Sequence, residues 1–491
     1  MKTRKRDSEL VYAGKVPETS ILENTVGAPL EPVKRFGGTK GWANMLVSGE
    51  NMAALKTLLE MKREGRLKNT DGTRGVRLVY IDPPFSTNLK FKGKKDQLAY
   101  EDKLAGAEFL EFLRKRLVLL RELMAEDGSV FVHLDSKKAH HIKVVMDSVF
   151  GEENFLNDII WSYGGRGAKH ISSKFSRNHD IILWYQRSSH IFNRTFVGKR
   201  IKKGTAGFRE DSDGRWFKTS PRGDYTDKSI SALTKEGRVY RTKNNTVRIK
   251  YYLREDGDWL IEDKLVGDVW DDIPDAMHLG ESEKTGYPTQ KPEALLSRII
   301  KTATNEGDLV LDAFAGAGTA LAAAEKLGRR WVGIDSGRLA VHTIEKRLLT
   351  VKGSKEIEDP KKRYSKGPSP FTLFEAHEGG CAHCEEPLVK SDYSYDEDTD
   401  DLVIKIKKFT SHARSAKGRF KNFETLSTVM IDYDFDGEVF NLCGFFTARE
   451  LEGKGYEIRF PADKARGEIM VIYSDIFGNE KWFVGEVLAH G

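Results

Sequence analysis

The sequence contains few cysteines and no long apolar run. Three cysteines in 491 residues are too few for a disulfide framework and favour a reducing compartment, so we expect a cytoplasmic protein. No run of 18 apolar residues occurs, which argues against a membrane-spanning helix. The basic N-terminus, MKTRKRDSELVYAGKVPETS, is not followed by the apolar core of a signal peptide. We therefore expect neither a secreted disulfide scaffold nor a membrane protein.

A strong overall charge is also missing. The formal charge is only +6, from 80 Lys and Arg against 74 Asp and Glu, so the distribution of charge matters more than its sum. Between Arg194 and Lys250, however, 16 Lys or Arg stand against 6 Asp or Glu. The length exceeds that of one ordinary hydrophobic core and predicts two or three domains.

Strand and helix patterns alternate in two separate parts of the chain. Short apolar strands are expected at 45–48, 76–82 and 129–135, and again at 309–314 and 329–335, with amphipathic helices between them. This alternation predicts a parallel sheet covered by helices, interrupted by the basic segment. We divide the chain into a flexible basic arm (1–40), a first α/β half (41–155), an insertion (156–280), a second α/β half (281–352), an acidic linker (353–402) and a small β-rich domain (403–491).

The second α/β half contains a glycine-rich turn between a strand and a helix. In LDAFAGAG the strand ends at Asp312, and Gly316 and Gly318 allow a ligand to approach the backbone closely. Asp335 ends the next strand, where a carboxylate can bind ribose hydroxyls. The turn has neither the Gly-Lys-Ser/Thr of a P-loop nor the GxGxxG spacing. A nucleoside without a pyrophosphate, such as S-adenosylmethionine, is the expected ligand, and a tight packing turn is the alternative.

The first α/β half contains the stretch LVYIDPPFSTN. Asp82 follows the strand, Pro83 and Pro84 fix the backbone direction, and Phe85 offers a flat apolar face. An exocyclic amino group of a base is a poor nucleophile because its lone pair is delocalised into the ring. Its two N–H groups can donate hydrogen bonds to a carboxylate and to a fixed carbonyl, which frees the lone pair for attack on a methyl group. An aromatic ring can hold the extruded base. The alternative is a rigid strand-ending turn.

These stretches together resemble the permuted, β-class amino-DNA methyltransferases, in particular the modification subunits of type III restriction systems. The resemblance covers about residues 44–350 and keeps the order of that class, with the catalytic DPPF first, a variable region next and the donor loop last. It implies an α/β fold with a doubly wound, mostly parallel, Rossmann-like sheet. It also implies that S-adenosylmethionine is the cofactor, that double-stranded DNA is the substrate and that the basic insertion is a target-recognition region.

The resemblance assigns residue roles as well. It implies a catalytic loop formed by Asp82, Pro83, Pro84 and Phe85. It implies donor binding by Asp312, Phe314, Gly316, Gly318 and Thr319 in the glycine loop, by Asp335, and by Thr289 and Lys291 in YPTQKPE. Pro292 in the same segment also fits a plain helix start. Phe85 replaces the commoner Tyr, and Glu50 stands where the family often has Asp and receives no role.

The expected function is site-specific methylation of adenine N6 in DNA, within a restriction-modification or phage-defence system. Asp82 favours adenine, because cytosine-N4 enzymes of the family usually carry Ser at this position. The alternatives are a cytosine-N4 enzyme and a catalytically inactive DNA-binding adaptor, with RNA as a weaker substrate. A homodimer and a separate helicase-nuclease subunit are expected by analogy. The C-terminal domain could dock that subunit, bind DNA or mediate dimers.

No metal site is expected. Cys381 and Cys384 in CAHC form half of a zinc-binding pattern, but the third cysteine, Cys443, lies far away in the sequence. A site completed by His377 or His383 is the minor alternative. A different histidine, at position 133, lies near the end of an expected strand, where we expect a structural role.

Overall fold

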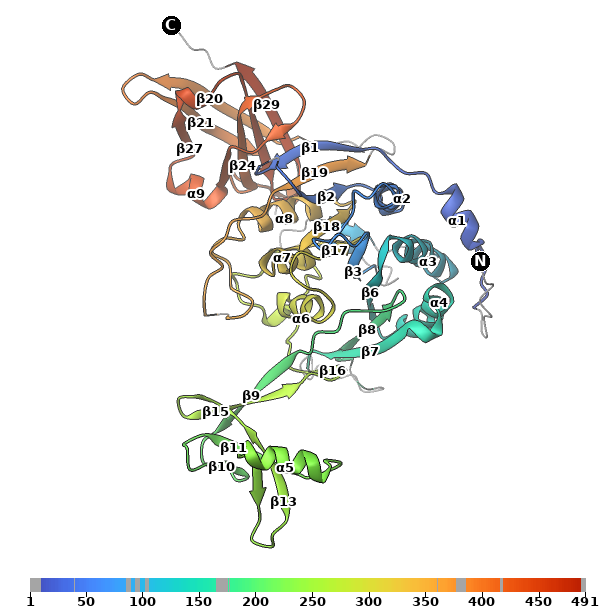
Figure 1. The fold of residues 1–491 in the computed structure, drawn as a ribbon. Helices are drawn as coiled ribbons and strands as arrows, with labels where there is room; N and C mark the ends of the chain where they lie inside the picture. Colours follow the sequence, from blue (N-terminus) through green and yellow to red (C-terminus); the bar gives the residue numbers. More distant parts are fainter. Residues whose placement is uncertain are drawn as a thin grey trace. The chain divides into compact units, whose positions relative to one another are not determined.

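The computed structural model describes residues 10–38, 40–84, 90–92, 98–101, 106–164, 175, 177–359, 361–376, 386–415 and 418–486. The chain separates into two units. The main unit comprises residues 1–193 and 268–491, and the inserted unit comprises Arg194–Gly267 (Figure 1). Each unit is described by itself below.

A large sheet runs through the main unit. All neighbouring strands from β6 to β19 are parallel, whereas β8 pairs antiparallel with β6 and β7, and β1 pairs antiparallel with β19. The strands, in spatial order, are β16 (Val269–Trp270), β7 (Phe155–Ser162), β8 (His179–Gln186), β6 (Met124–Asp135), β3 (Val76–Ile81), β17 (Leu309–Asp312), β18 (Arg330–Asp335), β2 (Asn44–Ser48), β19 (Phe371–Ala376), β1 (Leu30–Phe36) and β25 (Phe440–Asn441).

Helices cover both faces of the parallel part of this sheet. In Figure 1, α2, α3 and α4 lie on one side of the strands and α6, α7 and α8 on the other. Helix α3 illustrates why they pack there, since Phe109, Leu113, Leu117 and Leu120 recur at helical spacing and are buried. The helices of the main unit around this sheet are α1 (Glu18–Asn24), α2 (Asn51–Arg63), α3 (Gly106–Leu123), α4 (Ala139–Phe150), η1 (Glu152–Asn154), η2 (Ala276–His278), α6 (Glu293–Ala303), α7 (Thr319–Lys326) and α8 (Arg338–Leu349).

The C-terminal part of the main unit is built mainly of strands. Its core includes Ile404, Phe409, Val429 and Val471. Two sheets carry it, one with β20 (Leu388–Asp396), β21 (Asp401–Thr410) and β27 (Glu457–Pro461), the other with β26 (Gly444–Thr447), β24 (Leu426–Phe435), β28 (Glu468–Asp475) and β29 (Glu480–Glu486). Smaller elements are α9 (Ala448–Gly453), η3 (Ala462–Lys464) and the pair β22 (Arg414–Ser415) and β23 (Gly418–Arg419). The pair β4 (Lys90–Lys92) and β5 (Leu98–Glu101) lies between β3 and α3 in the chain.

The inserted unit has its own small sheets and a small core of Ile230, Leu233 and Ile249. One sheet contains β14 (Arg254–Asp256), β15 (Trp259–Leu265) and β9 (Phe196–Lys202). The other contains β10 (Phe208–Glu210), β11 (Trp216–Pro221), β13 (Val247–Tyr252) and β12 (Val239–Arg241), and α5 (Asp227–Lys235) packs beside it.

The predicted fold class is confirmed, because a mostly parallel sheet between helices is combined with further β-rich parts. Three segments lie elsewhere than the sequence indicates. Within 156–193, expected in the insertion, β7 and β8 extend the large sheet. The expected linker 353–402 supplies β19 to the same sheet, and the expected arm supplies β1. The charged residues of LEPVKRF do not indicate a buried strand, so β1 cannot be recognised from the sequence. In the structure its last residue, Phe36, stacks on Phe371 with ring centroids 4.3 Å apart.

Among the described residues, the structure contains no helix that is both long and apolar enough to cross a membrane.

A buried lysine joins the two ends of the main unit. Lys34 in β1 is only 3% exposed. Its ammonium lies 3.2 Å from Glu345 Oε1 in α8 and 2.7 Å from Glu480 Oε1 in β29. Burial raises the pKa of Glu345 to about 7, and the positive charge of Lys34 opposes this shift. One cation therefore compensates the buried carboxyl group of Glu345 and the partly buried one of Glu480, which come from distant segments.

We expect Lys34→Met to lower the free energy of unfolding by about 3–5 kcal/mol, because it leaves the buried Glu345 and the partly buried Glu480 without their cation. The measurement is urea denaturation at neutral pH. The matched control is Lys407→Met, which removes an exposed ion pair with Asp392 and should change the free energy by less than about 1 kcal/mol. Equal effects of the two substitutions would contradict this role of Lys34.

Candidate active site

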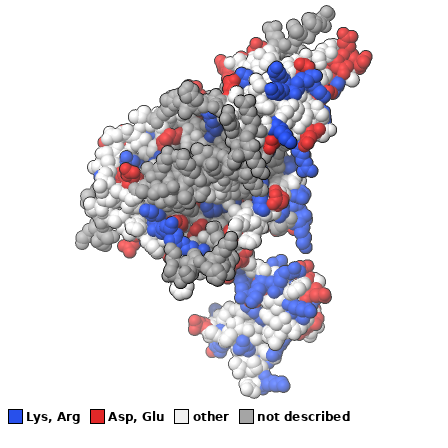
Figure 2. Space-filling model, turned by 180° about the vertical axis from the view of Figure 1, so that it is seen from behind, with Lys and Arg blue, Asp and Glu red and all other residues white. Residues whose placement is uncertain are grey.

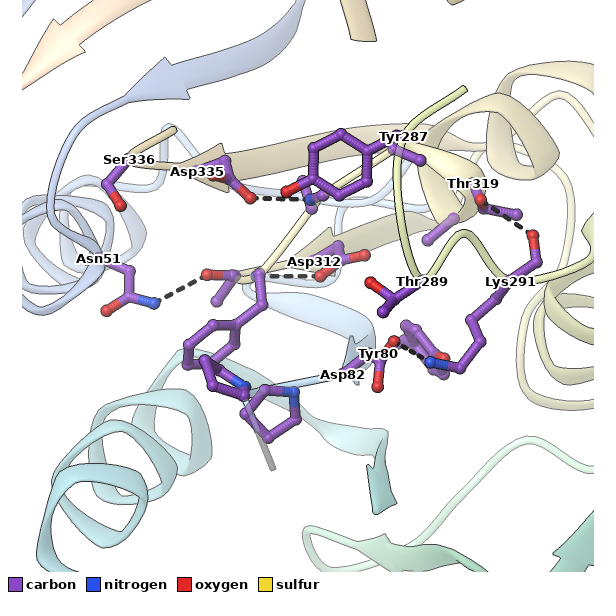
Figure 3. Close-up of a pocket in the computed structure, with 18 of the residues that line it drawn as sticks. Asn51, Tyr80, Asp82, Tyr287, Thr289, Lys291, Asp312, Thr319, Asp335 and Ser336 are labelled. Carbon is purple, nitrogen blue, oxygen red and sulfur yellow. Dashed lines mark hydrogen bonds and ion pairs between the residues drawn. The ribbon is translucent and has the colours of Figure 1, made fainter. Parts of the chain in front are cut away.

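Three neighbouring parallel strands of the large sheet end in aspartates. Asp82 directly follows β3, Asp312 ends β17 and Asp335 ends β18. Because β3 pairs with β17 and β17 pairs with β18 in parallel register, the three carboxyl groups lie at the same edge of the sheet. They line one cavity of about 290 Å³ (Figure 3).

The strand order explains why a cavity forms there. After β3 the chain continues through α3 to β6 on one side, whereas after β17 it continues through α7 to β18 on the other side. The connections therefore diverge between β3 and β17 and leave a crevice above their carboxyl ends, which is where open α/β sheets bind ligands. The two halves of the α/β domain meet at this crevice.

The glycine turn after β17 is held by both neighbouring aspartates. Asp312 Oδ1 accepts a 3.0 Å hydrogen bond from the amide of Phe314, and Asp335 Oδ2 accepts one of 2.8 Å from the amide of Gly316. Gly318 has a φ of +68°, and a Cβ there would lie 2.8 Å from Ile344 Cγ1. Gly318 therefore allows α7 to begin against α8 and is absent from the cavity lining, whereas Gly316, with a φ of +50°, lines the cavity.

Two of the carboxyl groups have raised pKa values. Burial raises the pKa of Asp312 to about 8, and the negative charges of Asp82 and Asp335 add to the shift. Burial also raises the pKa of Asp335, opposed by the amides of Gly337 and Gly316, which donate to its two carboxyl oxygens. Asp312 is thus favoured in its neutral form near neutral pH.

Asp82 is paired with a residue from the other half of the α/β domain. Its Oδ2 forms an ion pair with the ammonium of Lys291, and the two side chains are 19% and 12% exposed. Its Oδ1 is buried and has no hydrogen-bond partner among the described residues. Pro83 and Pro84 line the cavity beside it, whereas Phe85 lies outside the described residues.

The segment YPTQKPE forms a wall of the cavity. Thr289 has a φ of +61°, which is unusual for a residue with a branched side chain, and its hydroxyl donates to the carbonyl of Pro288. The hydroxyl of Thr319 in α7 donates to the carbonyl of Lys291 over 3.2 Å. Pro292 precedes the first residue of α6. The helix-start interpretation of Pro292 therefore holds together with a cavity-lining position for Lys291.

The opposite wall comes from α2 and α3. The Asn51 amide donates to the carbonyl of Ala313 over 2.8 Å. The Arg116 guanidinium contacts Asn51 and Glu50 and stacks over the Phe112 ring at 3.5 Å. Glu50 also caps α2. This network fixes the glycine turn from the side that faces α3.

Beneath Asp82, a buried chain of polar side chains leads away from the cavity. Tyr80 lines the cavity, and its hydroxyl lies 3.0 Å from Nδ1 of His133, whose Nε2 lies 3.1 Å from Asp180 Oδ2. Burial, joined by the charge of Asp82, raises the pKa of Tyr80 far above its usual value. Although burial favours neutral Asp180, the hydrogen bond from His133 lowers its pKa below the usual value. His133 is fully buried and bonded on both sides, as a structural histidine is.

The cavity brings together most of the residues that the sequence singles out: Asp82, Pro83, Pro84, Thr289, Lys291, Asp312, Phe314, Gly316, Thr319 and Asp335. Sequence reasoning missed Asn51, Tyr80, Phe112, Arg116, Tyr287, Gln290 and Ser336, which also line it. Tyr80 could have been found, since residues two apart in a strand point to the same side and Tyr80 precedes Asp82 by two. The contacts of Arg116 carry no comparable sequence signal.

Within the described residues, no group of His, Cys, Asp and Glu is arranged to hold a metal ion. Cys381 and Cys384, with the neighbouring His377 and His383, lie outside the described residues. Cys443 is an exposed free thiol.

Comparison with known proteins places this site in a family. A family model described as DNA methylase, covering N6 and N4 enzymes, matches residues 76–346, more than half of the chain. The chain belongs to the N6/N4 DNA methylase family. The match contains both the DPP turn after β3 and the glycine turn after β17. It therefore includes most of the cavity lining, whereas Gly49, Glu50 and Asn51 precede it.

Individual relatives cover different shares of this DNA methylase. The type II methyltransferase M.EcaI of Enterobacter cloacae is 30% identical over 69% of this chain and 77% of its own length. The probable type III HindVI Mod subunit of Haemophilus influenzae is 27% identical over 62% of this chain, but over only half of its own length. Among solved structures, the M1.HpyAVI–SAM complex is 17% identical over 62% of this chain and 98% of its own, with a TM-score of 0.35.

We expect the stability of this DNA methylase to depend on the titration of Asp312. Because its pKa is raised to about 8 in the folded protein, folding binds a proton between about pH 4 and pH 8, and stability falls as pH rises through this range. The isosteric Asp312→Asn variant lacks this titration. Its free energy of unfolding, measured with urea, should rise relative to the wild type by up to about 1.4 kcal/mol per pH unit between pH 5 and pH 8. A difference that is independent of pH would contradict the shift.

Proposed function

We propose that this protein is a site-specific DNA methyltransferase that transfers a methyl group from S-adenosylmethionine to N6 of adenine. The observation that carries the proposal is the shared cavity, because the DPP turn after β3 and the glycine turn after β17 open into the same space. Direct transfer requires the donor methyl and the acceptor amino group to meet in one place. The relative M.EcaI, named a methyltransferase, supports the same reaction class.

The cavity lining fits the donor. Phe314 and Leu296 offer apolar surface to an adenine ring, and the turn at Gly316 allows close approach. Each carboxyl oxygen of Asp335 accepts one backbone amide and keeps a lone pair for a ribose hydroxyl. Thr289 and Lys291 on the other wall offer polar groups to an amino-acid moiety. Bound S-adenosylmethionine would supply a methyl carbon on a positively charged sulfur.

The acceptor base is held by Asp82 and the proline turn. The Asp82 carboxylate accepts one N–H of the amino group, and a carbonyl of the rigid proline turn accepts the other, which localises the lone pair on nitrogen. The N–C bond forms as the S–C bond breaks, sulfur keeps the electron pair, and nitrogen releases one proton to the carboxylate. Stacking of the extruded base on Phe85 remains a prediction, because this residue lies outside the described part of the chain.

Adenine is the preferred base because position 82 is Asp, where the cytosine-N4 members that the sequence resembles usually carry Ser. The family model itself covers both kinds of enzyme. Cytosine N4 is therefore the second candidate, and an inactive DNA-binding adaptor is the third. The nature of the methylated nucleoside separates the first two, and the absence of any transfer identifies the third.

We expect Asp82→Ala to lower methyl transfer at least about a hundredfold, because the acceptor nitrogen loses its charged partner. The measurement is transfer of tritiated methyl from S-adenosylmethionine to mixed-sequence DNA, followed by mass analysis of the nucleosides. Donor binding should persist in this variant. The control Asp398→Ala changes an exposed carboxylate in the C-terminal part and should retain full activity.

Equal activity of wild type and Asp82→Ala would refute the mechanism. N4-methylcytosine as the product would favour the second candidate. Tight DNA binding without labelled product from the wild type would favour the adaptor.

We further propose that the inserted unit recognises the target DNA. Residues 194–267 contain 18 Lys or Arg and 11 Asp or Glu, whereas the rest of the chain contains 62 and 63. The net positive charge therefore resides in this unit, and Figure 2 shows many Lys and Arg on its visible face. Arginines stack on its aromatic rings, for example Arg215 over Tyr252 at 3.9 Å. Positive side chains beside aromatic and polar groups suit phosphate and base contacts.

We expect the double variant Lys199→Glu/Lys202→Glu to weaken DNA binding and flatten its salt dependence. Both side chains are exposed on β9 and have no acidic partner among the described residues. Each lost phosphate contact should reduce the slope of log K against log salt by about 0.9. The measurement is fluorescence anisotropy at salt concentrations from about 50 to about 300 mM.

The matched control for this prediction is Lys408→Glu/Lys464→Glu, which makes the same change of charge at exposed positions of the C-terminal part. It should leave the slope unchanged. An equal loss in the control would assign DNA binding to the C-terminal part instead.

Partners beyond DNA are proposed from the relatives alone. The HindVI and StyLTI relatives are named Mod subunits of type III restriction-modification enzymes, and this chain spans about half of their length. A separate restriction subunit is therefore a predicted partner. The homodimer stays a prediction from analogy with the family.

A further inference from the structure

The ion pair between Lys291 and Asp82 occupies the position that the proposed function assigns to the target base. The Lys291 ammonium donates to Asp82 Oδ2 inside the cavity, and Figure 3 shows its side chain reaching across to this carboxylate. An ammonium and an exocyclic amino group both present N–H donors to a carboxylate. As long as Lys291 donates to Asp82 Oδ2, this oxygen is not available to the amino group of an arriving base.

Lys291 pairs with Asp82 because the other acids of the cavity are already engaged. Asp335 accepts the amides of Gly316 and Gly337 on its two oxygens. Glu50 pairs with Arg116.

Asp312 offers little negative charge to Lys291 near neutral pH. Burial raises its pKa to about 8, so its carboxyl group is favoured in the neutral form near neutral pH. Among the acids that line the cavity, Asp82 is therefore the one whose charge is left for the lysine.

The lysine side chain is anchored at its backbone and can change partner. The carbonyl of Lys291 is fixed by Thr319, and α6 begins two residues later, after Pro292. The four-carbon stem beyond this anchor carries a single compact charge on rotatable bonds. A ligand carboxylate placed beside Thr289 and Gln290, which line the same wall, would compete with Asp82 for the ammonium.

We propose that Lys291 is a placeholder that occupies the catalytic carboxylate until the methyl donor binds. The amino-acid carboxylate of the donor then draws the lysine away. This inference rests on the proposed function and adds a regulation to it. With the donor absent, Asp82 Oδ2 is held by the lysine and is not available to the amino group of a base. With the donor bound, Lys291 pairs with the donor and Asp82 becomes available to the amino group. The two ligands then bind with positive cooperativity, and the coupling acts equally in both directions.

The proposal predicts an unusual effect of removing the catalytic acid. In Asp82→Ala, donor binding no longer has to break the ion pair, so affinity for a ligand with the amino-acid carboxylate should increase by at least about fivefold, the lower end of common coupling strengths. The probe is S-adenosylhomocysteine. Because its sulfur is uncharged, losing the negative charge of Asp82 does not remove an attraction to a sulfonium, and the change in affinity reports on the lysine. Isothermal titration calorimetry in the absence of DNA measures the dissociation constant.

Two controls isolate the lysine. 5′-Methylthioadenosine lacks the amino-acid moiety, and its affinity should be the same in wild type and Asp82→Ala. In the Lys291→Met background, S-adenosylhomocysteine should bind more weakly than in the wild type, and Asp82→Ala should then produce no gain. The isosteric Asp82→Asn variant repeats the comparison if the alanine variant does not fold.

The outcomes separate this inference from the proposed function. A gain for S-adenosylhomocysteine that is lost with Lys291→Met supports the placeholder. Equal or weaker binding by both Asp82 variants overturns it and leaves the ion pair as a permanent structural contact, while the methyltransferase assignment stands. Failure of the wild type to bind S-adenosylhomocysteine at all would overturn the proposed function as well.

Discussion

The parallel pairing of β3 with β17 is the constraint on which the site depends. This pairing joins two halves of the chain that are more than 200 residues apart and sets Asp82, Asp312 and Asp335 at one edge of the sheet. It also makes the connections diverge, which opens the crevice. Every further contact of the site, from the amides on Asp335 to the ion pair of Lys291 with Asp82, refines a position that the strand order has already determined.

Sequence reasoning reached the strand-end residues because their signal is local. An apolar strand followed by DPP, or by a glycine turn, can be recognised from about ten residues of sequence, and Asp335 ends a strand with a clear apolar pattern. The adjacency of β3 and β17 has no such local signal, because the two strands lie more than 200 residues apart in the chain. The contact between Lys291 and Asp82 spans 209 positions and follows from which acids are left unpaired in the folded cavity, a property that no single segment carries.

The same distinction explains the segments that lie elsewhere than expected. The charges of β1 are typical of an exposed arm in the sequence, and only in the fold do Glu345 and Glu480 compensate the charge of Lys34. β7 and β8 pair antiparallel at the end of a parallel sheet, a position that an alternation of strands and helices does not predict. Local pattern thus specified elements with strong apolar periodicity, and tertiary partners specified the others.

The central claim is that both halves of the chain build one methyl-transfer site. Long-read modification mapping of DNA from cells that express this chain alone tests it most directly, since it reports base, position and sequence context together. We expect N6-methyladenine in one sequence context, present with the wild type and absent with Asp82→Ala. Methylation that persists in the Asp82→Ala variant would contradict it.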